Sequence, residues 1–133
     1  PYLVLGADTV FSPGDVALFG RAFVAAGAGG ALALRPLDAA AATRNGVRAA
    51  EGLVERLRSP APTHVGAPLW GVGPQVAALV TELRGEPPHE LAAAFQAAID
   101  TGTRIAGIEI GPTRDLTTPA DVLLENFPYL RDL

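Results

Sequence analysis

The chain has 133 residues and a mass of 13.6 kDa, the length of one compact domain. Its composition, 49% hydrophobic and 18% charged, is that of a globular protein and excludes a disordered or fibrous chain. A net charge of −4 argues against nucleic acids and anionic membranes as partners. Cysteine and lysine are both absent, which excludes thiolate chemistry, Schiff-base lysines and phosphate-loop lysines.

The sequence also lacks the signals of membrane insertion and export. No apolar run reaches the ~20 residues that a membrane-spanning helix needs, and no basic-then-apolar leader opens the chain. We therefore expect a soluble, cytoplasmic protein. The chain opens directly on an apolar run without an initiator Met, which indicates a piece of a longer protein.

Apolar runs and turn residues divide the chain into short elements. The run at 2–7 predicts a buried strand, and Ser12–Asp15 predicts a helix start with Ser12 as N-cap and Pro13 at the first helical position. Glycines within 27–30 end this helix before a strand at 31–35, so the order indicates a parallel crossover. The later predicted elements are an alanine-rich segment ending in a turn (36–46), a hairpin (47–50 and 53–57), a loop (58–63), a strand (67–72), a helix (74–84), a break (85–88), a helix (89–101), a strand (104–110), a loop (111–116) and a helix (119–126).

The last helix repeats the start signal of the first. Thr118 precedes Pro119 as Ser12 precedes Pro13, so Thr118 is the expected N-cap. The order of elements predicts an α/β fold, with a mixed, mostly parallel sheet flanked by helices in three layers. In such sheets ligands bind beyond the carboxyl ends of the strands, where loops meet helix N-termini.

Two carboxylates follow predicted strands at such positions. Asp8 follows the first strand and Asp115 follows the strand at 104–110, and a proline-containing helix start comes soon after each. Carboxylates from distant parts of the chain can share a hard divalent ion such as Mg²⁺. The alternative is that each aspartate only accepts hydrogen bonds from backbone donors in its own loop.

The other polar residues indicate no chemistry of their own. His64 and His89 have no carboxylate or hydroxyl at a spacing typical of catalytic groups, so structural or solvated roles are expected for both. The two serines, Ser12 and Ser59, lie in a predicted cap and a proline-rich loop, and no Gly-x-Ser-x-Gly elbow is present. Neither a G-x-G-x-x-G sequence after a strand nor a Gly-Lys phosphate loop occurs, and the glycines at 27–30 end a helix instead of opening one.

Several segments, in order, resemble the sugar-phosphate nucleotidyltransferases. The run Tyr2–Thr9 resembles the family's central strand, which ends in a Gly-Asp pair, and Arg114–Asn126 resembles its closing Asp-Ile-Gly-Thr-Pro-Glu-Asp segment. The segments between them resemble the Tyr-Gly-Val, Asp-Gly, Glu-Lys-Pro and Gly-x-Tyr landmarks: Asn45–Val47, Glu51–Gly52, Arg58–Pro60 and Ala67–Trp70. The resemblance covers most of the chain, and the order of the segments makes it specific.

The resemblance implies roles for four residues. In that family the aspartates that match Asp8 and Asp115 hold Mg²⁺ for catalysis, and the glycine that matches Gly46 lies against the sugar. A glycine in a tight turn is the alternative for Gly46. The Glu-Lys-Pro motif reads Arg58-Ser59-Pro60, so Arg58 is the expected replacement for the lysine that binds the sugar phosphate, although it cannot accept bonds from sugar hydroxyls. Ala7 stands where the family has glycine before the first aspartate.

The family's glycine-rich signature loop, with its Arg and Lys, precedes the central strand and has no counterpart in this chain. Residues 1–133 are therefore expected to be one domain, the C-terminal, sugar-side portion of a nucleotidyltransferase, and inactive alone. The implied reaction joins an NTP and a sugar 1-phosphate into an NDP-sugar and pyrophosphate. Two alternatives stay open: a non-catalytic domain that binds a sugar nucleotide or a protein partner, and a cytidylyl- or molybdopterin-type transferase. The sequence leaves the sugar, the base and the oligomeric state open.

Overall fold

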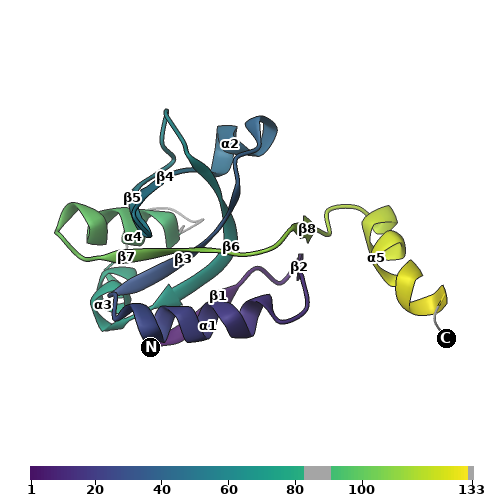
Figure 1. Cartoon of the computed structure of the whole chain (residues 1–133), viewed down its shortest axis with the longest axis horizontal. Coiled ribbons are helices and arrows are strands. Elements are labelled where there is room, and N and C mark those ends of the chain that lie inside the picture. Colours follow the sequence, from purple (N-terminus) through teal and green to yellow (C-terminus); the bar gives the residue numbers. More distant parts are fainter. Residues whose placement is uncertain (83–90, 132–133) are drawn as a thin grey trace.

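The computed structural model describes residues 1–82 and 91–131, which form short strands and helices (Figure 1). In chain order these are β1 (Tyr2–Leu5), β2 (Thr9–Phe11), α1 (Asp15–Ala26), β3 (Gly30–Pro36), α2 (Ala39–Asn45), β4 (Gly46–Ala50), β5 (Leu53–Leu57), β6 (His64–Val72), α3 (Pro74–Thr81), α4 (Leu91–Asp100), β7 (Ile105–Glu109), β8 (Thr113–Asp115) and α5 (Pro119–Arg131). Within the described ranges no helix is long and apolar enough to cross a membrane.

Six strands form the main sheet, in the order β1-β6-β3-β7-β5-β4. β4 also pairs with β6, through Gly46 opposite Val65 and Val47 opposite His64, so the sheet closes into a ring. The long strand β6 makes this closure because it pairs with β3 along its length and with β4 through its first two residues. Its last residues pair with β1, which lies outside the ring. A separate two-stranded sheet, β2 with β8, lies beyond the ring on the side of α5 (Figure 1).

The expectation of a mostly parallel sheet is wrong. Among the strands that the structure describes, β3 and β7 make the one parallel pairing, and the other pairings are antiparallel. β1 and β3 do run in the same direction, as the strand–helix–strand order requires. They are not neighbours, because β6 lies between them and runs opposite to both.

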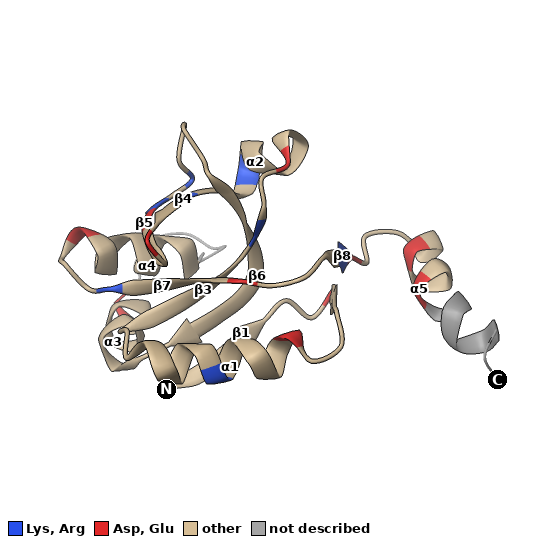
Figure 2. Ribbon diagram, viewed as in Figure 1, with Lys and Arg blue, Asp and Glu red and all other residues tan. Residues whose placement is uncertain are grey.

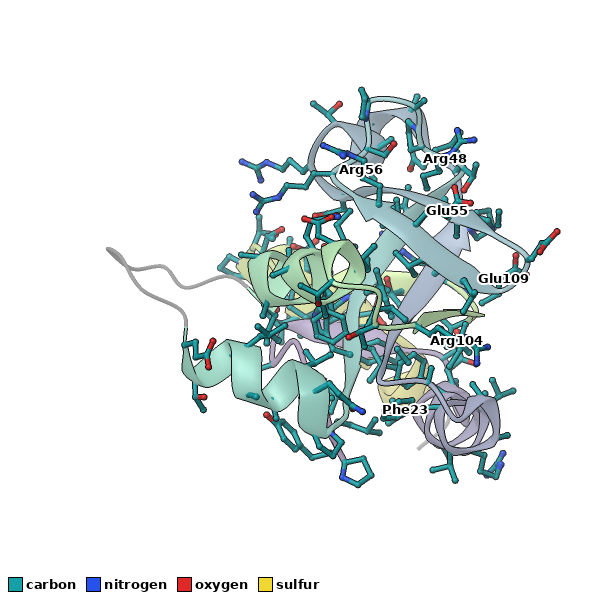
Figure 3. The ribbon with its side chains drawn as sticks, turned by 90° about the vertical axis from the view of Figure 1, so that its left-hand side faces the viewer. Phe23, Arg48, Glu55, Arg56, Arg104 and Glu109 are labelled. Atoms are coloured by element: carbon teal, nitrogen blue, oxygen red, sulfur yellow. The ribbon has the colours of Figure 1, made fainter. Side chains whose placement is uncertain are left out.

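Helices cover both faces of the sheet, which confirms the expected mixed α/β architecture. On one face, Phe19 and Phe23 of α1 pack on small residues of β3, β6 and β7. A Cβ on Gly71 would lie 2.6 Å from the ring of Phe23, so this glycine lets α1 approach the sheet closely (Figure 3). On the other face, α3 and α4 bury Val76, Phe95 and Ala98 against the larger side chains of the same strands.

The predicted hairpin is confirmed in β4 and β5. Its turn residues Glu51 and Gly52 both have positive φ, 52° and 75°, as tight two-residue hairpin turns require. Arg48 and Glu55 face each other across the strands, with Nε and Oε2 3.0 Å apart (Figure 3). Both side chains are about half exposed, so this ion pair adds little to stability.

Several predicted helix boundaries are confirmed, but the predicted start of the first helix is wrong. Gly27 ends α1 with φ 57°, and Thr118 accepts a hydrogen bond from the N–H of Asp121 as the N-cap of α5. The first helix, however, begins at Asp15 after Gly14 (φ 85°), without a side-chain cap. Ser12 does not cap it because its hydroxyl donates instead to the carbonyl of Pro112, 3.0 Å away.

Other differences follow from pairing between distant segments. The first strand, expected to be buried, is a half-exposed edge strand in which Tyr2 and Leu5 are 51% and 44% exposed. The loop expected at 111–116 contains β8, and the alanine-rich segment contains α2, whose N-cap Asp38 accepts from the N–H of Ala40. The last helix continues to Arg131, beyond its expected end. The helix that begins at Pro74 ends at Thr81, three residues before its expected end. The predicted break at 85–88 and His89 lie outside the described residues.

Candidate active site

The β2–β8 ladder brings the two predicted metal-binding aspartates together. Thr9 lies opposite Asp115, and its hydroxyl donates to Oδ1 of Asp115 over 3.2 Å across 106 positions of sequence. The N–H of Leu116 donates to the carbonyl of Asp8 over 2.6 Å. Asp8 and Asp115 are therefore neighbours, and both line the same pocket.

A second group of hydrogen bonds fixes the loops around this ladder. The carboxylate of Asp15, in the first turn of α1, accepts from the N–H of Gly111 at 2.9 Å. The bond from Ser12 to Pro112 joins the same two segments one step further along. The segments after β1 and after β7 are thus tied to each other along their length, and this positions Asp8 beside Asp115.

The pocket has a volume of about 550 Å³ and opens beside the two aspartates. Its apolar wall comes from β3, β4, β5, β6 and α4, with Leu32, Val47, Leu57, Trp70 and Leu91 among the lining residues. The ring centroid of Trp70 lies 4.7 Å from that of Phe95, with the planes inclined at 54°. This contact packs the indole against a fully buried residue, so the wall is rigid where Trp70 faces the pocket.

Three arginines also line the pocket, and they come from three separate segments of the chain. Arg58, expected from the sequence, follows β5 and has φ 48°, a backbone conformation that non-glycine residues rarely adopt. Arg35 near the end of β3 and Arg44 in the last turn of α2 were not expected. The elements that carry Arg35 and Arg44 meet at one end of the sheet, where arginine colouring is visible on both (Figure 2). An arginine at the end of a strand has no distinctive sequence signal, whereas a basic residue in the last turn of a helix is a known favourable position.

Gly46 does not line the pocket, although its neighbours Asn45 and Val47 do. A Cβ at this position would lie 2.6 Å from the carbonyl oxygen of Ala42 and 3.0 Å from Pro62. Close packing between α2 and the loop before β6 therefore accounts for the glycine, and a contact with a sugar stays a prediction. His64, expected to be structural, bonds Thr63 through Nδ1 at 2.8 Å and Glu109 through Nε2 at 3.2 Å, outside the pocket lining.

Asp8 and Asp115 both carry carboxylates, a type of ligand that suits Mg²⁺. This ion is typically held by one or two carboxylates together with water and substrate phosphates. Across residues 1–82 and 91–131 there is no group of three or more His, Cys, Asp or Glu side chains that could hold a metal. Asp8 and Asp115 are two carboxylates at one pocket, and two carboxylates are enough for an ion whose other ligands are water and phosphate.

The helix beyond the second aspartate starts with a reciprocal cap. Oδ2 of Asp121 accepts from the N–H groups of Thr118 and Thr117, at 2.7 and 3.0 Å, and from both threonine hydroxyls. The bonds from Thr118, and then those from Thr117, hold the pKa of Asp121 below its usual value. Arg114 of β8 forms an ion pair with Glu125 of α5. The end of β8 that carries Asp115 is thereby anchored to α5.

By sequence, the chain matches no family model and no curated protein. By structure, it is similar to a UDP-glucose pyrophosphorylase complexed with UDP-glucose (TM-score 0.74, 14% identity, 98% of this chain and 56% of that chain). It is also similar to the inositol-1-phosphate CTP transferase from T. maritima (TM-score 0.71, 17% identity, 90% and 50%) and to UTP-bound UGPase from Acinetobacter baumannii (TM-score 0.72, 14% identity, 96% and 50%).

The chain therefore spans about half the length of the solved structures that it matches. At these identities the similarity shows the fold and assigns no substrate. The matched region covers 90–98% of the chain. The chain has the fold found in one half of nucleotidyltransferases.

Proposed function

We propose that this chain forms the sugar-side half of a nucleotidyltransferase that makes an NDP-sugar and pyrophosphate from an NTP and a sugar 1-phosphate. One observation supports the proposal: in the fold of these enzymes, the pairing of Thr9 with Asp115 and the bond from Leu116 to Asp8 bring the two aspartates to one pocket of about 550 Å³. Pockets with an apolar wall and a few convergent polar groups are typical of small-molecule sites.

Asp8 and Asp115 would hold the Mg²⁺, each through its carboxylate. The bound ion would offset the negative charge of the phosphates during transfer. Thr9 orients Asp115 through the bond to Oδ1, and this leaves the second oxygen of the carboxylate available to a ligand. Asp15 and Ser12 act indirectly, because they fix the loop that leads into β8.

The arginines and the apolar wall would bind the acceptor. A sugar 1-phosphate is largely a dianion at neutral pH, because the second pKa of a phosphate monoester is about 6. An oxygen of this phosphate attacks the α-phosphorus of the NTP, and the bond from that phosphorus to the bridging oxygen breaks to release pyrophosphate. The attacking oxygen carries no proton, so the site needs no general base. Arg58 would orient the phosphate, and Trp70 would support the sugar.

One observation favours the non-catalytic alternative. Ser59, at the position of the family's lysine, is 7% exposed and accepts a hydrogen bond from the N–H of Ala61, so it does not reach into the pocket. A domain that binds a sugar nucleotide without turnover needs no cation there. The similarity to an inositol-1-phosphate CTP transferase also leaves the kind of phosphorylated acceptor open.

The test is pyrophosphate release by the complete protein that carries this chain, with each NTP, glucose 1-phosphate and Mg²⁺. We expect Mg²⁺-dependent release, and we expect Asp8→Asn and Asp115→Asn each to lower kcat by orders of magnitude, since each removes a charge that holds the ion. Asp100→Asn is the matched control, because Asp100 ends α4 outside the pocket lining. The 133-residue chain alone should show no turnover. Release that is indifferent to both site substitutions would overturn the mechanism, and no release with any sugar 1-phosphate would favour the binding module.

A further inference from the structure

Arg35 has an unusual environment for an arginine near the end of a strand. It is the sixth residue of β3, lies opposite Val65 of β6 and is half-buried at the wall of the pocket. None of the ion pairs that the structure describes involves Arg35. A structural arginine at such a position normally pairs with a carboxylate or with backbone carbonyls.

The Nε atom of Arg35 is buried and has no hydrogen-bond partner among the described residues. A buried N–H group without a partner is destabilising, because it has lost its bonds to water and gained none in return. Glu125 Oε1 is the other buried side-chain atom of this kind in the described part of the chain, and it lies beside Arg114. Within residues 1–82 and 91–131, Arg35 has no such neighbour, so its donor lacks a partner in this part of the protein and lies beside a pocket.

We propose that Arg35 is a substrate-binding residue that grips an anionic group of the acceptor through its Nε edge. The guanidinium presents Nε–H and one Nη–H as parallel donors, and this edge matches two oxygens of a phosphate or a carboxylate. An anion bound side-on would satisfy the buried donor and neutralise the charge. The role as an acceptor site rests on the function proposed above, whereas the binding of an anion does not.

The charges around the pocket favour this ligand class. Among the described residues, three arginines and two aspartates line it, so this described lining carries a net positive charge in a chain of net charge −4. A divalent cation on the aspartates would increase this imbalance. A positive pocket on an acidic protein attracts anions selectively. Because Arg58 is the residue expected to bind the transferred phosphate, Arg35 either shares that phosphate or holds a second anionic group on the sugar.

Binding of small phosphates without metal tests the proposal directly. Glucose 1-phosphate, glucose 1,6-bisphosphate and unphosphorylated glucose are titrated by calorimetry into the 133-residue chain and its Arg35→Gln and Arg35→Lys variants. The matched control is Arg21→Gln, because Arg21 is exposed on α1 and lies outside the pocket lining. We expect both Arg35 variants to weaken phosphate binding by about 10- to 100-fold. Glutamine removes the charge, and lysine keeps the charge but lacks the two parallel N–H donors of the guanidinium. The control should bind like the unmodified chain.

The two probes distinguish the sources of the anion. If Arg35 shares the transferred phosphate, Arg35→Gln weakens the binding of both phosphates equally. If it holds a second anionic group, only the bisphosphate loses affinity. Unchanged affinity for both would overturn the proposal, as would an unmodified chain that binds neither phosphate at millimolar concentration. Affinity of Arg35→Lys equal to that of the unmodified chain would overturn the side-on geometry.

Thermal stability separates a binding role from a structural one. Arg35→Met removes the unpaired donor while keeping the length of the side chain, so the Tm of the ligand-free chain should stay the same or rise. A clear fall in Tm would indicate that Arg35 supports the fold and would overturn the proposal. If the complete protein releases no pyrophosphate but the Arg35 variants still lose phosphate affinity, the transferase function fails while the anion site stands.

Discussion

The carboxylate of Asp15 and the N–H of Gly111 lie 2.9 Å apart, which joins the first turn of α1 to the loop between β7 and β8. A Cβ on Gly111 would lie 3.0 Å from the same carboxylate oxygen and 3.1 Å from the hydroxyl of Ser12, so only glycine fits there without displacing a neighbour. This contact fixes the loop between β7 and β8, the strand that ends in Asp115.

Asp15→Ala should lower the free energy of unfolding by about 2 kcal/mol, since a hydrogen bond to a charged group contributes about 1.5–3 kcal/mol. Asp15→Asn keeps an acceptor and should cost less. Urea denaturation of the two variants measures the difference. Equal and small losses in both would show that the bond to Gly111 does not support the fold.

Thr9→Val should raise the Mg²⁺ requirement strongly while lowering the free energy of unfolding only slightly. It removes the donor to Oδ1 of Asp115 but keeps the size of the side chain, so we expect less than about 1 kcal/mol in stability. Loss of an orienting partner should raise the Mg²⁺ concentration for half-maximal pyrophosphate release by about tenfold in the complete protein. Thr9→Ser retains the hydroxyl and is the control. Equal Mg²⁺ requirements in the two variants would contradict a positioning role for Thr9.

Two glycines near α1 should respond in opposite directions to the same change. Gly71→Ala should destabilise the chain by about 1–3 kcal/mol, because its Cβ would meet the ring of the buried Phe23 at 2.6 Å. Gly20 lies within α1, and the atom nearest to a Cβ added there is 3.6 Å away. Gly20→Ala should therefore stabilise the chain by about 0.5–1 kcal/mol. Thermal unfolding of both variants tests the pair, and a Tm that falls for both would show that α1 is more tightly packed than the geometry indicates.

The cap of α5 should depend on pH in a defined direction. Hydrogen bonds from Thr118 and Thr117 lower the pKa of Asp121 below 3.8, so the ionised side chain stabilises the folded helix. That contribution is fully present above pH 3.8 and is lost as the pH falls through the lowered pKa. An NMR titration of the Asp121 carboxyl should give a midpoint below 3.8. Thr118→Ala should move the midpoint back toward that value, and a midpoint at or above it in the unmodified chain would contradict the cap.

Much of the fold could be predicted because local signals decided it. Gly27 and Gly102 adopt the positive φ that ends a helix, and Glu51-Gly52 forms the hairpin turn. Ser12 was misassigned because its hydroxyl bonds a carbonyl 100 positions away, which no local pattern records. β8 was missed because Thr113, Arg114 and Asp115 have no apolar alternation, and its pairing with β2 makes it a strand. The N-cap Asp38 before the alanine run could have revealed α2.

The candidate site could also be predicted only in part from the sequence. The two aspartates were predicted from the strands they follow and from the resemblance, and the structure brings their backbones close together at one pocket. Their role as metal ligands and the contacts of Arg58 with substrate stay predictions. Arg35 could not be found from the sequence, because its place at the pocket depends on the pairing of β3 with β6 and β7.

The β2–β8 ladder has a kinetic consequence. Its three residue pairs join segments about a hundred positions apart, and its side chains are only partly buried or exposed. A contact of this kind closes a long loop at a large entropic cost and gains little buried surface in return, so it forms late in folding and opens first. Conditions that weaken the chain mildly should therefore separate Asp8 from Asp115 while the central sheet is still intact. Loss of ligand binding would then precede the cooperative unfolding transition.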